Sequence, residues 1–123
     1  MKTFNELKKG DILYQVELYN SNDFNIILHN VETVYEGRSR LTPVGEESFI
    51  IETNRCGYNF DLNSPIRKQC YGYVNVKESF RVIAPSIEGV LKAYEYWKSN
   101  VTFPESNILK LKLQLATESN GLY

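Results

Sequence analysis

The sequence predicts a mainly β (α+β) fold, in which a small barrel or curved antiparallel sheet carries one packed helix. Two patterns predict this class. Apolar and polar residues alternate through most of the chain up to Ala84, as they do in strands with one buried face. One segment with helical periodicity follows at about 86–98, and a lone amphipathic helix buries its apolar face against a sheet. The 123 residues suffice for one domain with a real core.

The segment from Ser86 to Lys98 is the clearest helix. Pro85 and Ser86 provide a start signal, with Ser86 as the N-cap residue. The apolar residues recur every three or four positions, which places them on one helical face. These residues are Ile87, Val90, Leu91, Tyr94 and Trp97.

Several elements precede this helix. A short helical turn opens the chain and ends at Gly10, which suits a left-handed backbone. The segment Ile12–Leu18 alternates as a strand whose even-numbered side chains are buried. A long strand runs from Phe24 to about Glu36, and its phase changes midway: one face carries Phe24, Ile26 and Leu28, and the other then carries Val31, Thr33 and Tyr35. A phase change within one strand predicts a bulge or a sharp bend, as in small barrels.

A hairpin is predicted next, from Cys56–Leu62 through a turn at Asn63 to Ile66–Val76. This register places Cys56 opposite Cys70, within reach of a disulfide. The start of the chain lacks a secretion signal, which favours two reduced thiols instead. A last short strand, Phe80–Ala84, leads into the helix.

The C-terminal part of the chain changes character. We expect residues 1–100 to form the barrel with its helix, 101–107 to be a linker, and 108–123 to be a C-terminal strand (about 108–116) and tail. An unpaired apolar strand is an aggregation site, so this strand has to pair with its own sheet, which is slightly favoured, or with a partner chain. Its apolar stripe consists of Leu109, Leu111, Leu113 and Leu115.

Composition argues against several classes of function. The net charge of −1 provides no general attraction to nucleic acid or anionic lipid. No apolar run approaches the length of a membrane helix, so we expect no membrane partner. The two cysteines and the single histidine, His29, are too few for a zinc site. We therefore expect no metal, no cofactor and no catalytic residue, and interpret His29 as a strand residue with a satisfied hydrogen bond or at an exposed edge.

The outer side of the predicted hairpin is the most suggestive surface. Exposed tyrosines beside cations can stack bases while the cations hold phosphates. The same residue types anchor protein interfaces. A third interpretation is packing, in which another element of the fold covers the tyrosines. We call these residues the tyrosine surface; they are Arg55, Tyr58, Arg67, Tyr71 and Tyr73.

Two passages carry a resemblance. The opening Phe4-x-x-Leu7-x-x-Gly10-Asp11, followed by short strands, resembles small Src-homology-3-like barrels of the Tudor/KOW kind. The passage Phe80–Ser86 before a helix is similar to small proteins of tailed phages that infect AT-rich gut bacteria. The resemblance implies the fold and a phage source, and with it a location that is cytoplasmic in a bacterial host cell or virion-associated. It implies no site residue, and because few basic residues follow Gly10-Asp11, it does not imply nucleic-acid binding.

From these observations we expect a non-enzymatic protein-interaction or assembly module, such as a phage accessory or structural protein, that associates with a protein partner or with itself. The tyrosine surface and the leucine stripe would be buried against partner subunits. The alternative is a single-stranded nucleic-acid-binding barrel, whose affinity would fall steeply with salt.

Overall fold

The computed structural model describes residues 2–18, 24–37, 48–55, 59–72, 79–99 and 108–121. Its strands are β1 (Ile12–Leu18), β2 (Asn25–Gly37), β3 (Ser48–Thr53), β4 (Asn59–Asn63) and β5 (Phe80–Ala84). Its helices are two 3₁₀ turns, η1 (Phe4–Glu6) and η2 (Ser64–Lys68), and two α-helices, α1 (Ile87–Lys98) and α2 (Ile108–Gly121).

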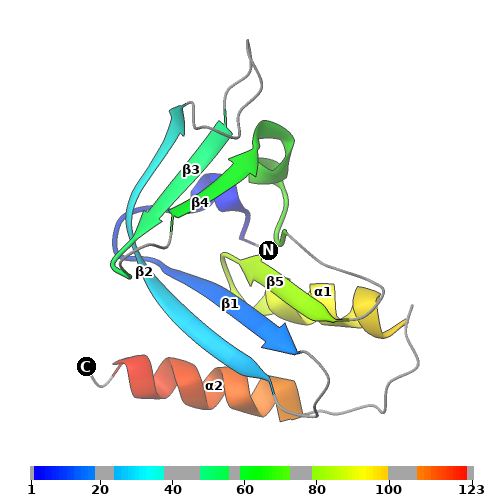
Figure 1. The fold of residues 1–123 in the computed structure, drawn as a ribbon. Coiled ribbons are helices and arrows are strands. Elements are labelled where there is room, and N and C mark those ends of the chain that lie inside the picture. Colours follow the sequence, from blue (N-terminus) through cyan, green and yellow to red (C-terminus); the bar gives the residue numbers. More distant parts are fainter. Residues whose placement is uncertain are drawn as a thin grey trace.

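Strand β2 joins the two halves of the sheet. Its first half pairs with β1 and its second half with β3, while β5 and β4 complete the edges, so the antiparallel order is β4-β3-β2-β1-β5. The sheet curls into a half-barrel (Figure 1). The predicted mainly β class with a curved antiparallel sheet is therefore confirmed.

The predicted bend in β2 is also confirmed, because the register with β3 shifts between Val31 and Thr33. Val31 is buried, as expected. The predicted grouping of Val31, Thr33 and Tyr35 on one face is wrong, however, because Thr33 and Tyr35 are exposed while Val34 packs inward with Val31. The extra residue of the bulge exchanges the two faces of the strand, and its exact position is not visible in the apolar pattern.

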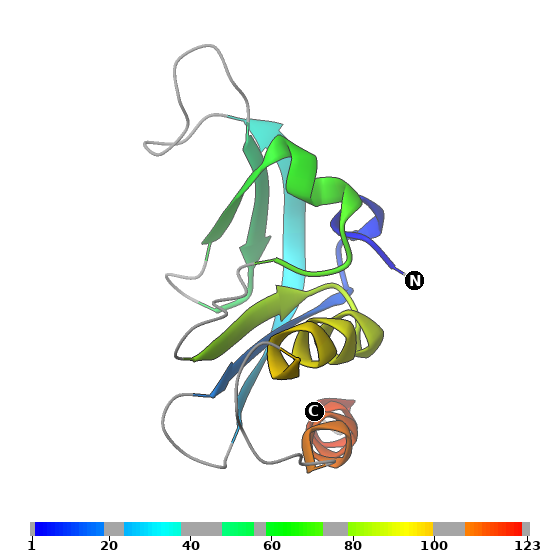
Figure 2. The same cartoon turned by 90° about the vertical axis from the view of Figure 1, so that its right-hand side faces the viewer.

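Two separate cores result from the curl. Helix α1 covers the outer face of β1 and β5, and α2 covers the outer face of β2 on the same side of the sheet (Figure 2). We call this the helix-side core; it includes Tyr14, Val16, Leu18, Phe24, Leu28, Phe80, Val82, Val90, Tyr94, Trp97, Leu109 and Leu113. The inner face of the curl holds the inner core, which consists of Phe4, Leu7, Leu13, Val31, Phe49, Ile51, Leu62 and Ile83.

Strand β1 contributes to both cores. The predicted even-numbered side is buried against the helices, where Val16 is inaccessible to solvent. Leu13, on the opposite side, is equally buried in the inner core. The strand is therefore sandwiched between two layers, which explains its high apolar content.

Helix α1 forms as predicted. The Ser86 hydroxyl oxygen accepts a hydrogen bond from the Gly89 N–H at 3.1 Å, which satisfies one of the free N–H groups of the first turn. Val90, Tyr94 and Trp97 are buried in the helix-side core. The opening turn also forms, as η1, and Gly10 follows it with φ +94°.

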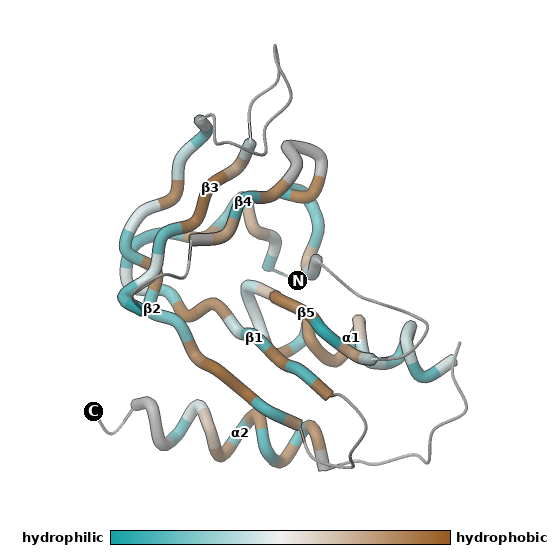
Figure 3. Tube along the Cα trace, viewed as in Figure 1, coloured by the Kyte–Doolittle hydropathy of each residue, from teal (hydrophilic) through white to brown (hydrophobic). Residues whose placement is uncertain are grey.

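The predicted C-terminal strand at about 108–116 is wrong, because this segment is helix α2. Leucine, lysine, glutamine and alanine are all good helix formers. The alternation of leucines has period two, but a helix can bury every fourth residue of such a run, and Leu109 and Leu113 fill the helix-side core in this way. Along the tube of α2 in Figure 3, hydrophobic and hydrophilic stretches follow each other in turn.

The predicted hairpin is also wrong. Strand β4 pairs with β3, and the chain then enters η2 rather than a returning strand. Within the described stretch that follows η2, residues 69–72, Gly72 makes an isolated bridge to Ile83 of β5. Cys70 has a free thiol. Cys56, the 101–107 linker and the C-terminal residues after Gly121 lie outside the described residues.

Candidate protein-interaction surface

Helix α2 presents leucines on two opposite sides. Residues four positions apart lie about 40° apart around a helix, so Leu109 and Leu113 form one pair and Leu111 and Leu115 form another. The first pair is 1% and 0% exposed, and it fixes the helix on the sheet. The second pair is 56% and 53% exposed. We call Leu111 and Leu115 the leucine ridge.

The leucine ridge stands out within the described residues. The other large apolar or aromatic side chains exposed to this degree there are Tyr35 and Tyr96, which carry hydroxyl groups that water can solvate. The ridge has no such polar atom. Helix α2 lies along one margin of the molecule (Figure 1), so its outer side is open to a partner.

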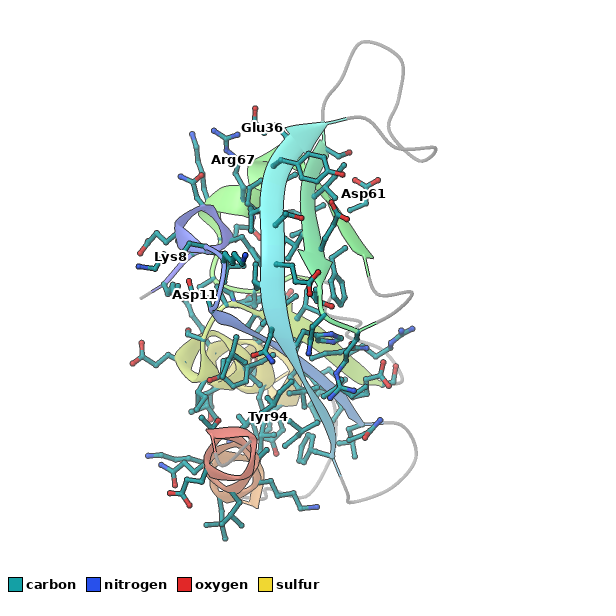
Figure 4. All side chains as sticks on the ribbon, turned by 90° about the vertical axis from the view of Figure 1, so that its left-hand side faces the viewer. Lys8, Asp11, Glu36, Asp61, Arg67 and Tyr94 are labelled. Carbon is teal, nitrogen blue, oxygen red and sulfur yellow. The ribbon has the colours of Figure 1, made fainter. Side chains whose placement is uncertain are left out.

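The structure distributes the residues of the predicted tyrosine surface over several places. Arg67 forms an ion pair with Glu36 at the end of β2 (Figure 4). Arg55 instead donates from Nε to the carbonyl oxygen of Leu28, at 2.9 Å. Leu28 and Glu36 are eight residues apart on β2, which corresponds to roughly 26 Å of strand. The two arginines therefore do not share one binding site.

Tyr71 is half-buried and packs against the helix-side core, which matches the packing interpretation of this residue. Burial raises the pKa of its hydroxyl, and the neighbouring Cys70 and Tyr96 raise this pKa further. Tyr58 and Tyr73, the remaining members of the predicted surface, lie outside the described residues.

A shallow pocket of about 430 Å³ lies beside Tyr71. Lys68 and Lys92 approach it from η2 and α1, and both are exposed. Two ammonium groups at one pocket can attract an anionic group. The remaining lining residues are Thr3, Gln69 and Cys70.

His29 lies at the centre of a polar chain that crosses the sheet. Its Nε2–H donates to Gln15 Oε1 at 2.8 Å, and its Nδ1 accepts from the Thr53 hydroxyl at 3.3 Å. The chain continues on one side to Glu17, which accepts from Gln15 Nε2 at 3.1 Å and pairs with Arg81 at 3.5 Å. The predicted hydrogen-bonded strand histidine is therefore confirmed.

This environment keeps the imidazole neutral. Burial lowers the pKa of His29 from 6.5 to about 4, and the positive charge of Arg55 contributes in the same direction. The ring is 0% exposed, and both nitrogens have partners within the sheet. The arrangement suits a structural group rather than a general base, which has to reach a substrate proton.

The described residues contain no group of three or more potential metal ligands. None of the helices in these parts of the chain has the length and apolarity needed to cross a membrane. Comparisons of the chain with protein-family models, with curated proteins and with solved structures find no match.

Sequence reasoning placed all four leucines on one surface, whereas the structure divides them into an anchoring pair and an exposed pair. The signal for this division is present in the sequence, because Leu109 and Leu113 have helical spacing and so do Leu111 and Leu115. The polar chain around His29 was missed, because its members come from strands that are distant in sequence.

Proposed function

We propose that this chain is a protein-interaction or assembly module, and that the leucine ridge of α2 is its contact surface. The observation that carries the proposal is the exposure of Leu111 and Leu115, at 56% and 53%, on a helix that is already anchored by its opposite side. An exposed single leucine is ordinary, but two leucines one turn apart form a continuous apolar surface. Helices with such a surface dock into grooves or against other helices.

The expected strength follows from the area available. Full burial of a leucine side chain contributes about 1.5–3 kcal/mol, and each ridge leucine is about half-buried already. The ridge then supplies about 2–3 kcal/mol before the cost of association. A contact of this size supports a weak complex, or one of several contacts in a larger assembly.

The test uses a photo-crosslinking amino acid at position 111 of the full chain. We expect crosslinked products in the purified protein or in an extract of the cells that produce it. The matched control carries the same amino acid at Glu88, an exposed position of α1, and should give none. If position 111 gives no product in either preparation, the proposal is wrong.

The setting that we propose is a phage accessory or structural protein, in the host cytoplasm or on the virion. Support comes from the resemblance of the Phe80–Ser86 passage to small phage proteins, and from a curved five-stranded sheet that is compatible with a small barrel. Mass spectrometry of purified virions and of infected cells tests this location, and absence of the chain from both contradicts it.

A second candidate function is binding of single-stranded nucleic acid at the pocket between Lys68 and Lys92. The observation in its favour is that these two cations and the half-buried ring of Tyr71 line the same pocket. Binding of a labelled oligothymidine should weaken steeply with salt and should be lost in the K68Q/K92Q variant. Affinity that is independent of salt contradicts this candidate.

A further inference from the structure

The leucine ridge has opposite charges on the same flank. With about 100° per residue, Lys110 and Glu118 lie about 100° and about 20° from Leu111 in the same direction around the helix, which is about 120° and about 40° from the midpoint of the ridge. Both side chains are exposed. Lys112 lies about 100° from Leu111 in the other direction, on the opposite flank.

The charges of Lys110 and Glu118 do not stabilise α2 itself. A helix favours acidic residues in its first turn and basic residues in its last turn, because its N-terminus is the positive end of the macrodipole. Helix α2 has the reverse, with Lys110 in its first turn and Glu118 in its last. Neither side chain forms an ion pair within the described residues.

Pairing with a second copy explains this arrangement. When two identical helices pack antiparallel about a two-fold axis, the same flank of each faces the same flank of the other, with the ends exchanged. Lys110 of one copy then lies near Glu118 of the other, and the reciprocal pair forms by symmetry. In a parallel pair, opposite flanks meet, and Lys110 would approach Lys112 of the other copy.

We propose that α2 pairs antiparallel with α2 of a second copy of this chain, through the leucine ridges and two reciprocal Lys110–Glu118 ion pairs. This inference rests on the proposed function and names its partner. Four leucines form the centre of the contact. The surface area of two half-exposed leucine side chains per copy is far smaller than the area of about 800 Å² that each partner buries in a standard interface. The dimer is therefore weak and depends on concentration.

The test is a charge exchange, measured by sedimentation of the full chain over a range of concentrations. K110E alone and E118K alone should each lower the association constant about tenfold, because each leaves like charges facing each other twice in the dimer. The double variant K110E/E118K should restore association to within about twofold. Both substitutions interact favourably with the macrodipole of α2, so unfolding of the helix cannot explain a weakened dimer. Circular dichroism checks that the helix content is unchanged.

The matched control is K9E, which makes the same charge change at an exposed residue before β1 and should leave association unchanged. The inference is overturned if the double variant fails to recover, or if K110E strengthens association, as parallel pairing requires. A purified chain that stays monomeric at every concentration, but whose position 111 still crosslinks in extract, overturns self-pairing and leaves the proposed function standing. Absence of every crosslink contradicts both.

Discussion

His29 shows how one buried residue ties the halves of the sheet together. It lies on β2, and its two ring nitrogens contact β1 through Gln15 and β3 through Thr53. Its ring also meets Phe60 of β4 edge-to-face, with centroids 5.2 Å apart. A buried polar group with both partners in place specifies one arrangement of the strands, because any slip of register would leave it unsatisfied.

The depressed pKa of His29 predicts a specific dependence of stability on pH. His29 binds a proton near pH 6.5 in the unfolded chain and only near pH 4 in the folded chain. The contribution of neutral His29 to the free energy of unfolding is therefore complete above about pH 6.5 and declines as the pH falls toward 4. The free energy of unfolding declines by about 3 kcal/mol through this effect. In H29Q, this part of the decline should disappear.

Chemical denaturation of both proteins between pH 4 and pH 7.5 measures this effect. Carboxylates also titrate in this range, so the relevant quantity is the difference between the two free energies of unfolding. This difference should narrow as the pH falls. Parallel curves for the wild type and H29Q would show that the imidazole is not held neutral.

At the scale of elements, α2 predicts opposite results for neighbouring leucines. L113A removes a fully buried side chain and should lower the free energy of unfolding by about 2–5 kcal/mol. L111A should change it by no more than about 0.5 kcal/mol at low protein concentration, where copies do not associate. In a strand, residues 111 and 113 would share one face and the two losses would be similar. Thermal or urea denaturation distinguishes these cases.

The contact between α1 and the segment before β5 gives a second prediction at this scale. A Cβ atom at Gly89 would collide with the backbone carbonyl oxygen of Cys70, which cannot move aside as a flexible side chain can. Although alanine favours helices over glycine by about 1 kcal/mol, G89A should destabilise the protein by about 1–3 kcal/mol in total. K92A, at an exposed position of the same helix, is the control. A G89A protein as stable as the wild type would contradict the close packing.

Elements that depend on local pattern could be predicted from the sequence, and those that depend on distant partners could not. The strand β1, the bend in β2 and helix α1 follow from periodicity and from the Ser86 cap. The leucine run in α2 is compatible with both periods, and the helix-side core, built from distant segments, decides between them. The partner of β4 is likewise set by tertiary pairing with β3.

The same distinction holds for the candidate surface. Sequence reasoning singled out the leucines, and Leu111 and Leu115 are indeed exposed. It grouped Arg55 and Arg67 on one face, because the predicted hairpin would have aligned them. Each arginine is instead held by a different part of β2, through Leu28 and Glu36.

At the scale of the whole molecule, the residues that stabilise the fold are separate from the surface that we propose for association. The inner core and the helix-side core occupy the two faces of the curled sheet, and α2 lies beside α1 over the second (Figure 2). Because Leu109 and Leu113 hold α2 on the sheet, Leu111 and Leu115 lie on a helix that is already ordered. Association then requires no further loss of conformational entropy in this helix. The structure therefore pre-organises the surface that we propose for association.

The most direct test is the solution mass of the full chain, measured by light scattering beside the variant L111S/L115S. The account predicts that the wild-type mass rises toward twice the 14.3 kDa of the chain as concentration increases, and that the variant stays at the monomer mass with an unchanged fold. Equal masses for the two proteins at every concentration would contradict self-association through the leucine ridge.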